Sequence, residues 1–73
     1  MFRDRIEINP GILTGKPIIK GTRISVEFIL ELLSQGWSYE EILKNYSQLT
    51  REDILAAIEY CLEIIKEEKV YSI

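Results

Sequence analysis

The fold of this chain is decided by one stretch near its N-terminus, Gly15-Lys16-Pro17-Ile18-Ile19-Lys20-Gly21-Thr22-Arg23-Ile24-Ser25. Pro17 fixes its own φ and biases Lys16 away from the helical region. The β-branched pair Ile18-Ile19 favours a strand, and Gly21 permits a turn that a side chain would resist. Ser25 is a residue type that caps helices. The stretch therefore predicts a strand, a turn and a helix start, with extended chain before it and helices after it.

Residues 1–24 are predicted to form a basic extended arm or a small β-ribbon. Residues 5–8 alternate polar and apolar side chains, which is typical of a half-buried strand, and Asn9-Pro10-Gly11 predicts a turn. The second strand is expected at residues 18–20. Because an isolated two-stranded ribbon is unstable in water, it must pack on the helices or pair with the arm of a second copy. We favour a dimer formed through the arm and the first helix.

Three helix starts share one pattern, in which an apolar residue precedes Ser or Thr and isoleucine follows four residues later. This is the hydrophobic staple across an N-cap. The predicted caps are Ser25, Ser38 and Thr50; Glu41 completes a capping box with Ser38, and Asp53 makes a weaker one with Thr50. The helices are expected at about 26–35, 39–45 and 51–68. Residues 25–69 thus form a three-helix core, and residues 70–73 form a tail.

Apolar stripes at helical spacing predict which helix faces are buried. The expected core stripe of the first helix is Val26, Ile29, Leu30 and Leu33. Phe28 and Leu32 lie off that stripe and are candidates for a dimer seam. The expected stripe of the long third helix is Ile54, Ile58, Cys61, Leu62 and Ile65. Because Cys61 falls within this stripe, we interpret it as a small buried hydrophobe rather than a nucleophile.

Charge is distributed unevenly along the single 73-residue domain. Residues 1–23 carry five basic and two acidic groups, whereas residues 24–73 carry four basic and ten acidic groups. A basic arm on an acidic body indicates one of two things. Either the arm is attracted to the body, within one molecule or between two copies, or each part binds its own charged partner.

Several function classes are disfavoured. The chain has no histidine, and its single cysteine excludes an internal disulfide and a zinc cluster. Paired carboxylates fall in first turns of helices, where they suit the helix dipole, and no nucleophile–base pair is present. We therefore predict no enzyme activity, no metal and no cofactor. No apolar run approaches the ~20 residues of a membrane span, and no signal-peptide core is present, so we expect a cytoplasmic protein.

The chain resembles domain-of-unknown-function family 433 over roughly residues 6–62. The resemblance is carried by Gly-Lys-Pro-Ile-Ile-Lys-Gly-Thr-Arg-Ile-Ser-Val at 15–26, Gly-Trp-Ser-Tyr-Glu-Glu-Ile-Leu at 36–43, Leu-Thr-Arg-Glu-Asp-Ile at 49–54, and Asn9-Pro10. Members of this family are short prokaryotic proteins described as VapB-type antitoxin-like. The resemblance implies a mainly α, homeodomain-like helix-turn-helix bundle of three helices with a short N-terminal β-ribbon, a homodimer, and a partner toxin of the PIN-like nuclease type.

A helix-turn-helix points the start of its last helix at a DNA major groove. Arg51 could then contact guanine, and Gln48 or Asn45 adenine, while lysines bind phosphates. The full set of predicted DNA-binding residues is Lys16, Lys20, Arg23, Lys44, Asn45, Gln48, Thr50 and Arg51. The acidic exposed face of the third helix and a pI near 4.9 oppose this hypothesis, because phosphates repel carboxylates.

The second hypothesis is a protein-interaction module, an antitoxin that covers the basic substrate path of a PIN-like nuclease. Its predicted partner-binding residues are Phe28, Leu32, Glu59, Glu63 and Tyr71. An antitoxin-like regulator that binds both a toxin and operator DNA fits both halves of the charge distribution, and it is the function that we predict. The alternative is a homodimeric protein-interaction module that does not bind DNA.

Overall fold

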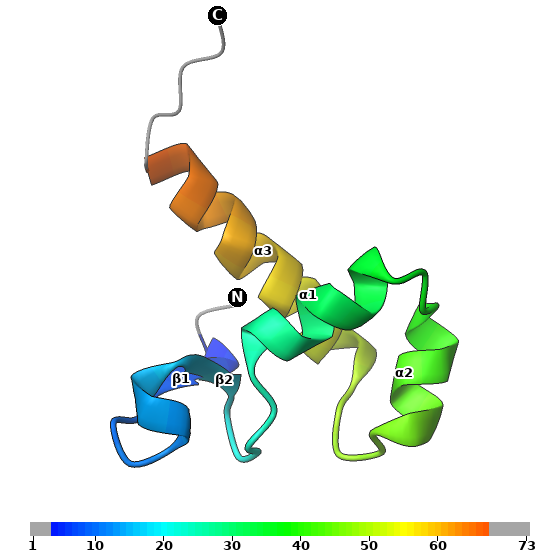
Figure 1. Ribbon diagram of the computed structural model, residues 1–73, viewed down its shortest axis with the longest axis horizontal. Coiled ribbons are helices and arrows are strands. Elements are labelled where there is room, and N and C mark those ends of the chain that lie inside the picture. The colour runs from blue at the N-terminus through cyan, green and yellow to red at the C-terminus, as the bar shows by residue number, and fades with distance from the viewer. Residues whose placement is uncertain (1–3, 68–73) are drawn as a thin grey trace, which may run out of the picture.

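The computed structural model describes residues 4–67, which form a small antiparallel sheet and three α-helices. In chain order the elements are β1 (Ile6–Ile8), the 3-10 turn η2 (Leu13–Gly15), β2 (Pro17–Ile19), α1 (Val26–Ser34), α2 (Tyr39–Asn45) and α3 (Arg51–Glu67). Figure 1 shows the sheet at one end of α1, α2 at the other, and α3 crossing α1 and projecting beyond it. The predicted mainly helical fold with an N-terminal ribbon is confirmed. The predicted tail at 70–73 lies outside the described residues.

The N-terminal ribbon packs on its own helices. β1 and β2 pair in the register Ile6↔Ile19 and Ile8↔Pro17. The second edge of β2 is covered by the chain that leads into α1, where the Ile19 amide donates to the Ile24 carbonyl at 2.9 Å. Ile18 and Ile19 are both buried. One chain thus stabilises the ribbon by itself, and dimerisation through the arm stays a prediction.

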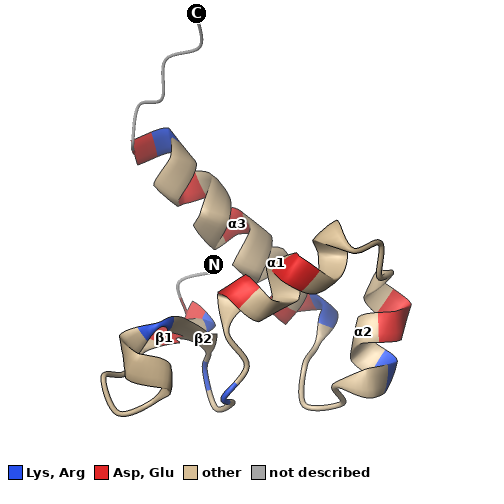
Figure 2. Cartoon of the chain, viewed as in Figure 1, with Lys and Arg blue, Asp and Glu red and all other residues tan. Residues whose placement is uncertain are grey.

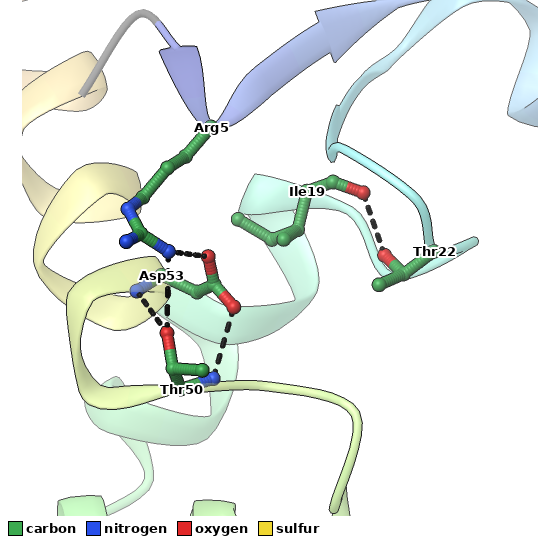
Figure 3. A network of polar contacts seen from close by, with 5 residues as sticks. All are labelled: Arg5, Ile19, Thr22, Thr50 and Asp53. Carbon is green, nitrogen blue, oxygen red and sulfur yellow. Dashed lines mark hydrogen bonds and ion pairs between the residues drawn. The ribbon is translucent and has the colours of Figure 1, made fainter. Parts of the chain in front are cut away.

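The turn after β2 has the geometry that its sequence favours. Gly21 adopts a φ of 83°, and the Thr22 amide donates to the Ile19 carbonyl at 3.0 Å. The Thr22 hydroxyl also donates to that carbonyl at 2.8 Å (Figure 3) and accepts from the Ile24 amide at 2.9 Å. These bonds redirect the chain from the sheet into α1.

The predicted helix caps are confirmed by their hydrogen bonds. The Ser25 hydroxyl accepts from the Phe28 amide at 2.9 Å. Ser38 and Glu41 form the reciprocal capping box at the start of α2, whose bounds match the prediction. α1 ends at Ser34, and Gly36, with a φ of 94°, completes a Schellman-type end just beyond it. These boundaries were predictable because each depends on a few adjacent residues.

The core differs in detail from the predicted stripe of α1. Ile29 is fully buried and Leu32 is only 6% exposed, whereas Leu30 and Leu33 are half-buried. The prediction that Leu32 lies off the core stripe is therefore wrong. The reason is that β2, α2, the turn after α2 and α3 all contribute to one core cluster with α1. This arrangement covers a wider arc of the helix than one stripe.

The predicted stripe of α3 is wrong beyond its first residue. Ile54 is fully buried, but Ile58, Leu62 and Ile65 are 36%, 48% and 51% exposed. The first turns of α3 instead bury Asp53, Ile54, Ala56 and Ala57. Alanines add little to an apolar pattern, yet their small side chains let helices approach closely. The bulky residues are left on the opposite side, and Cys61 is half-buried rather than buried.

Replacing the fully buried Ile29 by Ala should lower the free energy of unfolding by about 2–5 kcal/mol, because the core cannot close over the lost atoms. The matched control is Ile8→Ala, since Ile8 is 59% exposed; it should change stability by no more than about 0.5 kcal/mol. Urea denaturation followed by circular dichroism measures both. Equal losses of unfolding free energy in Ile29→Ala and Ile8→Ala would show that Ile29 does not belong to the core.

Candidate functional site

The start of α3 is tied to the N-terminal arm by one carboxylate, that of Asp53 (Figure 3). Asp53 Oδ2 accepts from the Thr50 amide at 2.9 Å, and Thr50 Oγ1 accepts from the Asp53 amide at 3.3 Å, so the predicted cap of α3 is formed. Arg5 Nη1 lies 3.0 Å from Asp53 Oδ1 and 3.4 Å from Thr50 Oγ1. The Asp53 side chain is only 9% exposed. A carboxylate so far removed from water is stable only when it is paired.

A second ion pair ties the arm to α1. Lys16 Nζ lies 2.9 Å from Glu27 Oε1, and both side chains are more than half exposed. A pair this exposed contributes at most about 1 kcal/mol. Attraction between arm and body, one of the two explanations for the charge asymmetry, therefore operates within the molecule for Arg5 and Lys16. The structure joins Lys16 to α1 rather than to the start of α3.

Three of the predicted DNA-binding cations are exposed and unengaged. Within residues 4–67 the side chains of Lys20, Arg23 and Lys44 make no hydrogen bond or ion pair. In Figure 2 the basic segments of the β2–α1 turn, the end of α2 and the start of α3 all lie in the lower half of the view. Lys20 also borders a hollow of about 400 Å³ with Asp4, Arg5 and Asp53. Lys20 is thus brought to the start of α3.

The polar residues around the turn between α2 and α3 are partly occupied within the chain. The Arg51 guanidinium lies over the Tyr39 ring, 4.8 Å from its centroid. Asn45 Nδ2 donates to the Glu41 carbonyl at 2.8 Å. Thr50 serves as the α3 cap, and Gln48 is exposed. Arg51 and Asn45 would therefore have to leave intrachain contacts to meet a base.

Arg5 and Tyr39 have roles here that the sequence reasoning missed. Arg5 joins a residue 48 positions away, and no local pattern indicates that pairing. One signal was available for Arg5, since a carboxylate that caps a helix and faces the core requires a cation. No such signal existed for Tyr39, because its contact with Arg51 depends on the angle between α2 and α3.

The most prominent exposed feature is a row of large apolar side chains on α3. We call it the exposed α3 stripe: Leu55, Ile58, Leu62 and Ile65. Their spacing places them along one side of the helix. An apolar surface of this kind marks an interaction site more often than a solvated face. Glu59 is exposed on the same helix, and Glu63 is half-buried and already interacts within the molecule.

The predicted partner-binding residues do not form one surface. Phe28 is half-buried and lies edge-on to Tyr46, with ring centroids 5.4 Å apart. Leu32 is in the core. Tyr71 lies outside the described residues. Only Glu59 and Glu63 lie on α3, so the dimer seam expected on α1 is replaced by the exposed α3 stripe as the candidate interface.

The described part of the chain offers few chemical alternatives. Among residues 4–67, no three His, Cys, Asp or Glu side chains are grouped so that they could hold a metal ion. In the same range, no helix has the length and apolar content needed to cross a membrane. What the surface does offer is a set of cations near the start of α3, with acidic residues such as Asp4 and Glu52 beside them, and an apolar row along the helix.

Comparisons with known proteins agree with this architecture. Residues 6–61 match the model of a family described as protein of unknown function (DUF433). A crystal structure of a DUF433 member from Anabaena variabilis ATCC 29413 is similar to this chain, with a TM-score of 0.81 and 36% sequence identity. The similarity covers 92% of this chain and 66% of that one. No curated protein matches.

Replacing Asp53 by Ala should lower the free energy of unfolding by about 1–3 kcal/mol, because the α3 cap is lost and Arg5 loses its partner. Glu52→Ala in the same turn is the matched control, since Glu52 is exposed, and should change stability by less than about 0.5 kcal/mol. In urea denaturation the Arg5→Ala and Asp53→Ala losses should be non-additive in the double variant. Strict additivity would contradict the ion pair.

Proposed function

This chain belongs to the DUF433 family of proteins of unknown function, and on that basis we propose that it is an antitoxin-like regulator. In this proposal it binds a PIN-like nuclease toxin through α3 and binds operator DNA with a homeodomain-like helix-turn-helix formed by α2 and α3. The family match itself names no activity. Support comes from the surface of α3 and from the placement of the basic side chains.

The observation that carries the proposal is the exposed α3 stripe together with the acidic residues beside it. Fully burying one such large aliphatic side chain is worth about 1.5–3 kcal/mol, so a partner that covers Ile58, Leu62 and Ile65 gains substantially. Glu59 and Glu67 are exposed on the same helix. A nuclease that binds nucleic acid has a basic substrate path, and an acidic, apolar helix complements it.

Operator binding is the second part of the proposal. Lys20, Lys44 and Arg51 are exposed near the start of α3, the end that a helix-turn-helix presents to DNA. The Arg51 guanidinium lies over the Tyr39 ring, and in this proposal it leaves the ring to contact a base. Phosphate contacts from these cations would give salt-sensitive binding.

A homodimeric protein-interaction module is the alternative, and the same exposed α3 stripe favours it. Two copies would bury the stripe against each other and leave DNA unbound. The antitoxin-like regulator should bind the product of the neighbouring gene and retard its own promoter DNA in a gel. The homodimeric module should do neither.

When this chain is co-expressed with the product of its neighbouring gene, the two should co-purify. Leu62→Asp should weaken that complex by at least about tenfold, because a carboxylate would be desolvated at the interface. Leu62 is 48% exposed, so the fold should survive, which circular dichroism checks. Glu40→Lys on α2 is the control and should leave the complex intact. If the wild type, Leu62→Asp and Glu40→Lys all co-purify equally well with the neighbouring gene product, α3 is not part of the interface.

Binding of the chain's own promoter DNA should weaken with added salt in gel-shift titrations. The double variant with Lys20→Ala and Arg51→Ala should lose about tenfold or more in affinity, because a base contact and a phosphate contact are removed. Lys66→Ala, at the far end of α3, should bind like wild type. The absence of any shift would favour the homodimeric module instead.

A further inference from the structure

A groove runs between α1 and the C-terminal half of α3. It has a volume of about 460 Å³ and is lined by apolar side chains, among them Val26, Leu30, Tyr60, Cys61, Ile64 and Ile65. The groove exists because α3 continues past the point where it packs on α1 (Figure 1). Ala57 is fully buried there, whereas Ile64, two turns later, is 40% exposed.

The groove continues onto the exposed α3 stripe. Ile65 lines the groove and also belongs to the stripe. Apolar surface therefore extends around the C-terminal half of α3, from the α1 side to the solvent side. A flat hydrophobic patch does not fix the position of a bound helix along it. A groove between two helices can hold a third helix through its apolar side chains at i, i+3 or i+4, and i+7.

The charge around the groove selects the occupant. The α1 wall carries Glu27 and Glu31, both exposed, and among residues 4–67 no Lys or Arg lines the groove. From Glu59 to its end at Glu67, α3 carries three glutamates and one lysine, Lys66, and none of these charged side chains lines the groove. A second copy that offered its own α3 would bring like charges together, which is unfavourable. A basic segment would be attracted by the α1 wall.

We propose that this groove is the docking site for a basic amphipathic helix of a protein partner. The inference rests on the proposed function only in requiring that the chain binds another protein. The apolar side of the incoming helix covers Leu30, Ile64 and Ile65. Its Lys or Arg residues meet Glu27 and Glu31 at the rim, where Glu27 can exchange its exposed pair with Lys16 for the partner's cation.

Cys61 allows a direct test, because it lines the groove and is the chain's single cysteine. The probes are helical peptides selected from a display library in which the charged positions are randomised between Lys, Glu and Gln over a fixed apolar i, i+3, i+7 pattern. The full chain is the target. Binding is measured by fluorescence anisotropy, and occupancy of the groove by the rate at which a thiol reagent modifies Cys61.

Lysine-rich helices should be enriched, and saturating peptide should slow Cys61 modification by about tenfold, since thiol reactivity depends on access. Glu31→Lys should weaken peptide binding by at least about fivefold, as expected for one rim charge pair. Ile64→Asp should abolish both binding and protection. Glu40→Lys, the matched charge reversal on α2, should behave like wild type.

Three results would overturn the proposal. The first is enrichment of glutamate-rich or uncharged helices, or of none. The second is peptide binding that leaves Cys61 modification unchanged. The third is a wild-type dimer in which Cys61 is protected and which Ile64→Asp converts to monomers, because the occupant would then be a second copy.

Two outcomes would distinguish a wrong docking groove from a wrong antitoxin function. A complex with the neighbouring gene product that persists in Glu31→Lys and Ile64→Asp refutes the groove and leaves the antitoxin proposal standing. Selective binding of lysine-rich helices without any such complex refutes the toxin partner and leaves the groove standing.

Discussion

One buried carboxylate holds the N-terminal arm and the start of α3 together. Asp53 caps α3 through Thr50 and pairs with Arg5 from the ribbon, at 2.9 Å and 3.0 Å. An unpaired charge at this depth would be strongly unfavourable, so the arm must lie where Arg5 can reach α3. That requirement places the ribbon on the helices, with Ile18 and Ile19 in the core, and it brings Lys20 to the start of α3.

Among residues 4–67, the last turns of α3 contribute much less to the core than its first turns do. The core cluster takes Ile54 and Ala57 from the first turns of the helix, and later turns carry exposed isoleucine and leucine. A small domain gains little stability by extending a helix beyond its core. In the proposed function the extension is a binding surface, with exposed cations near the start of α3 and acidic and apolar residues toward Glu67. Those two regions suit different macromolecules.

The sequence predicted what local chemistry controls. Ser25, Ser38 and Gly36 set helix ends through neighbours within a few residues, and the structure has those ends where the pattern placed them. It could not predict which side of α3 is buried. The buried side is set by Ala56 and Ala57, whose small side chains let α3 approach the rest of the core closely. In the hydrophobic pattern of the sequence, the larger isoleucines counted for more than these alanines. The pairing of Arg5 with Asp53 joins distant segments, and only the folded chain reveals it.

We infer that the C-terminal half of α3 serves binding rather than folding. The most direct test of this inference is the unfolding free energy of a double variant, Leu62→Asp with Ile65→Asp, measured by urea denaturation at micromolar concentration. Because both side chains are about half exposed, we predict a change of less than about 1 kcal/mol. A loss of about 3 kcal/mol or more would mean that these residues are part of the core, and the account of α3 as a binding surface would be wrong.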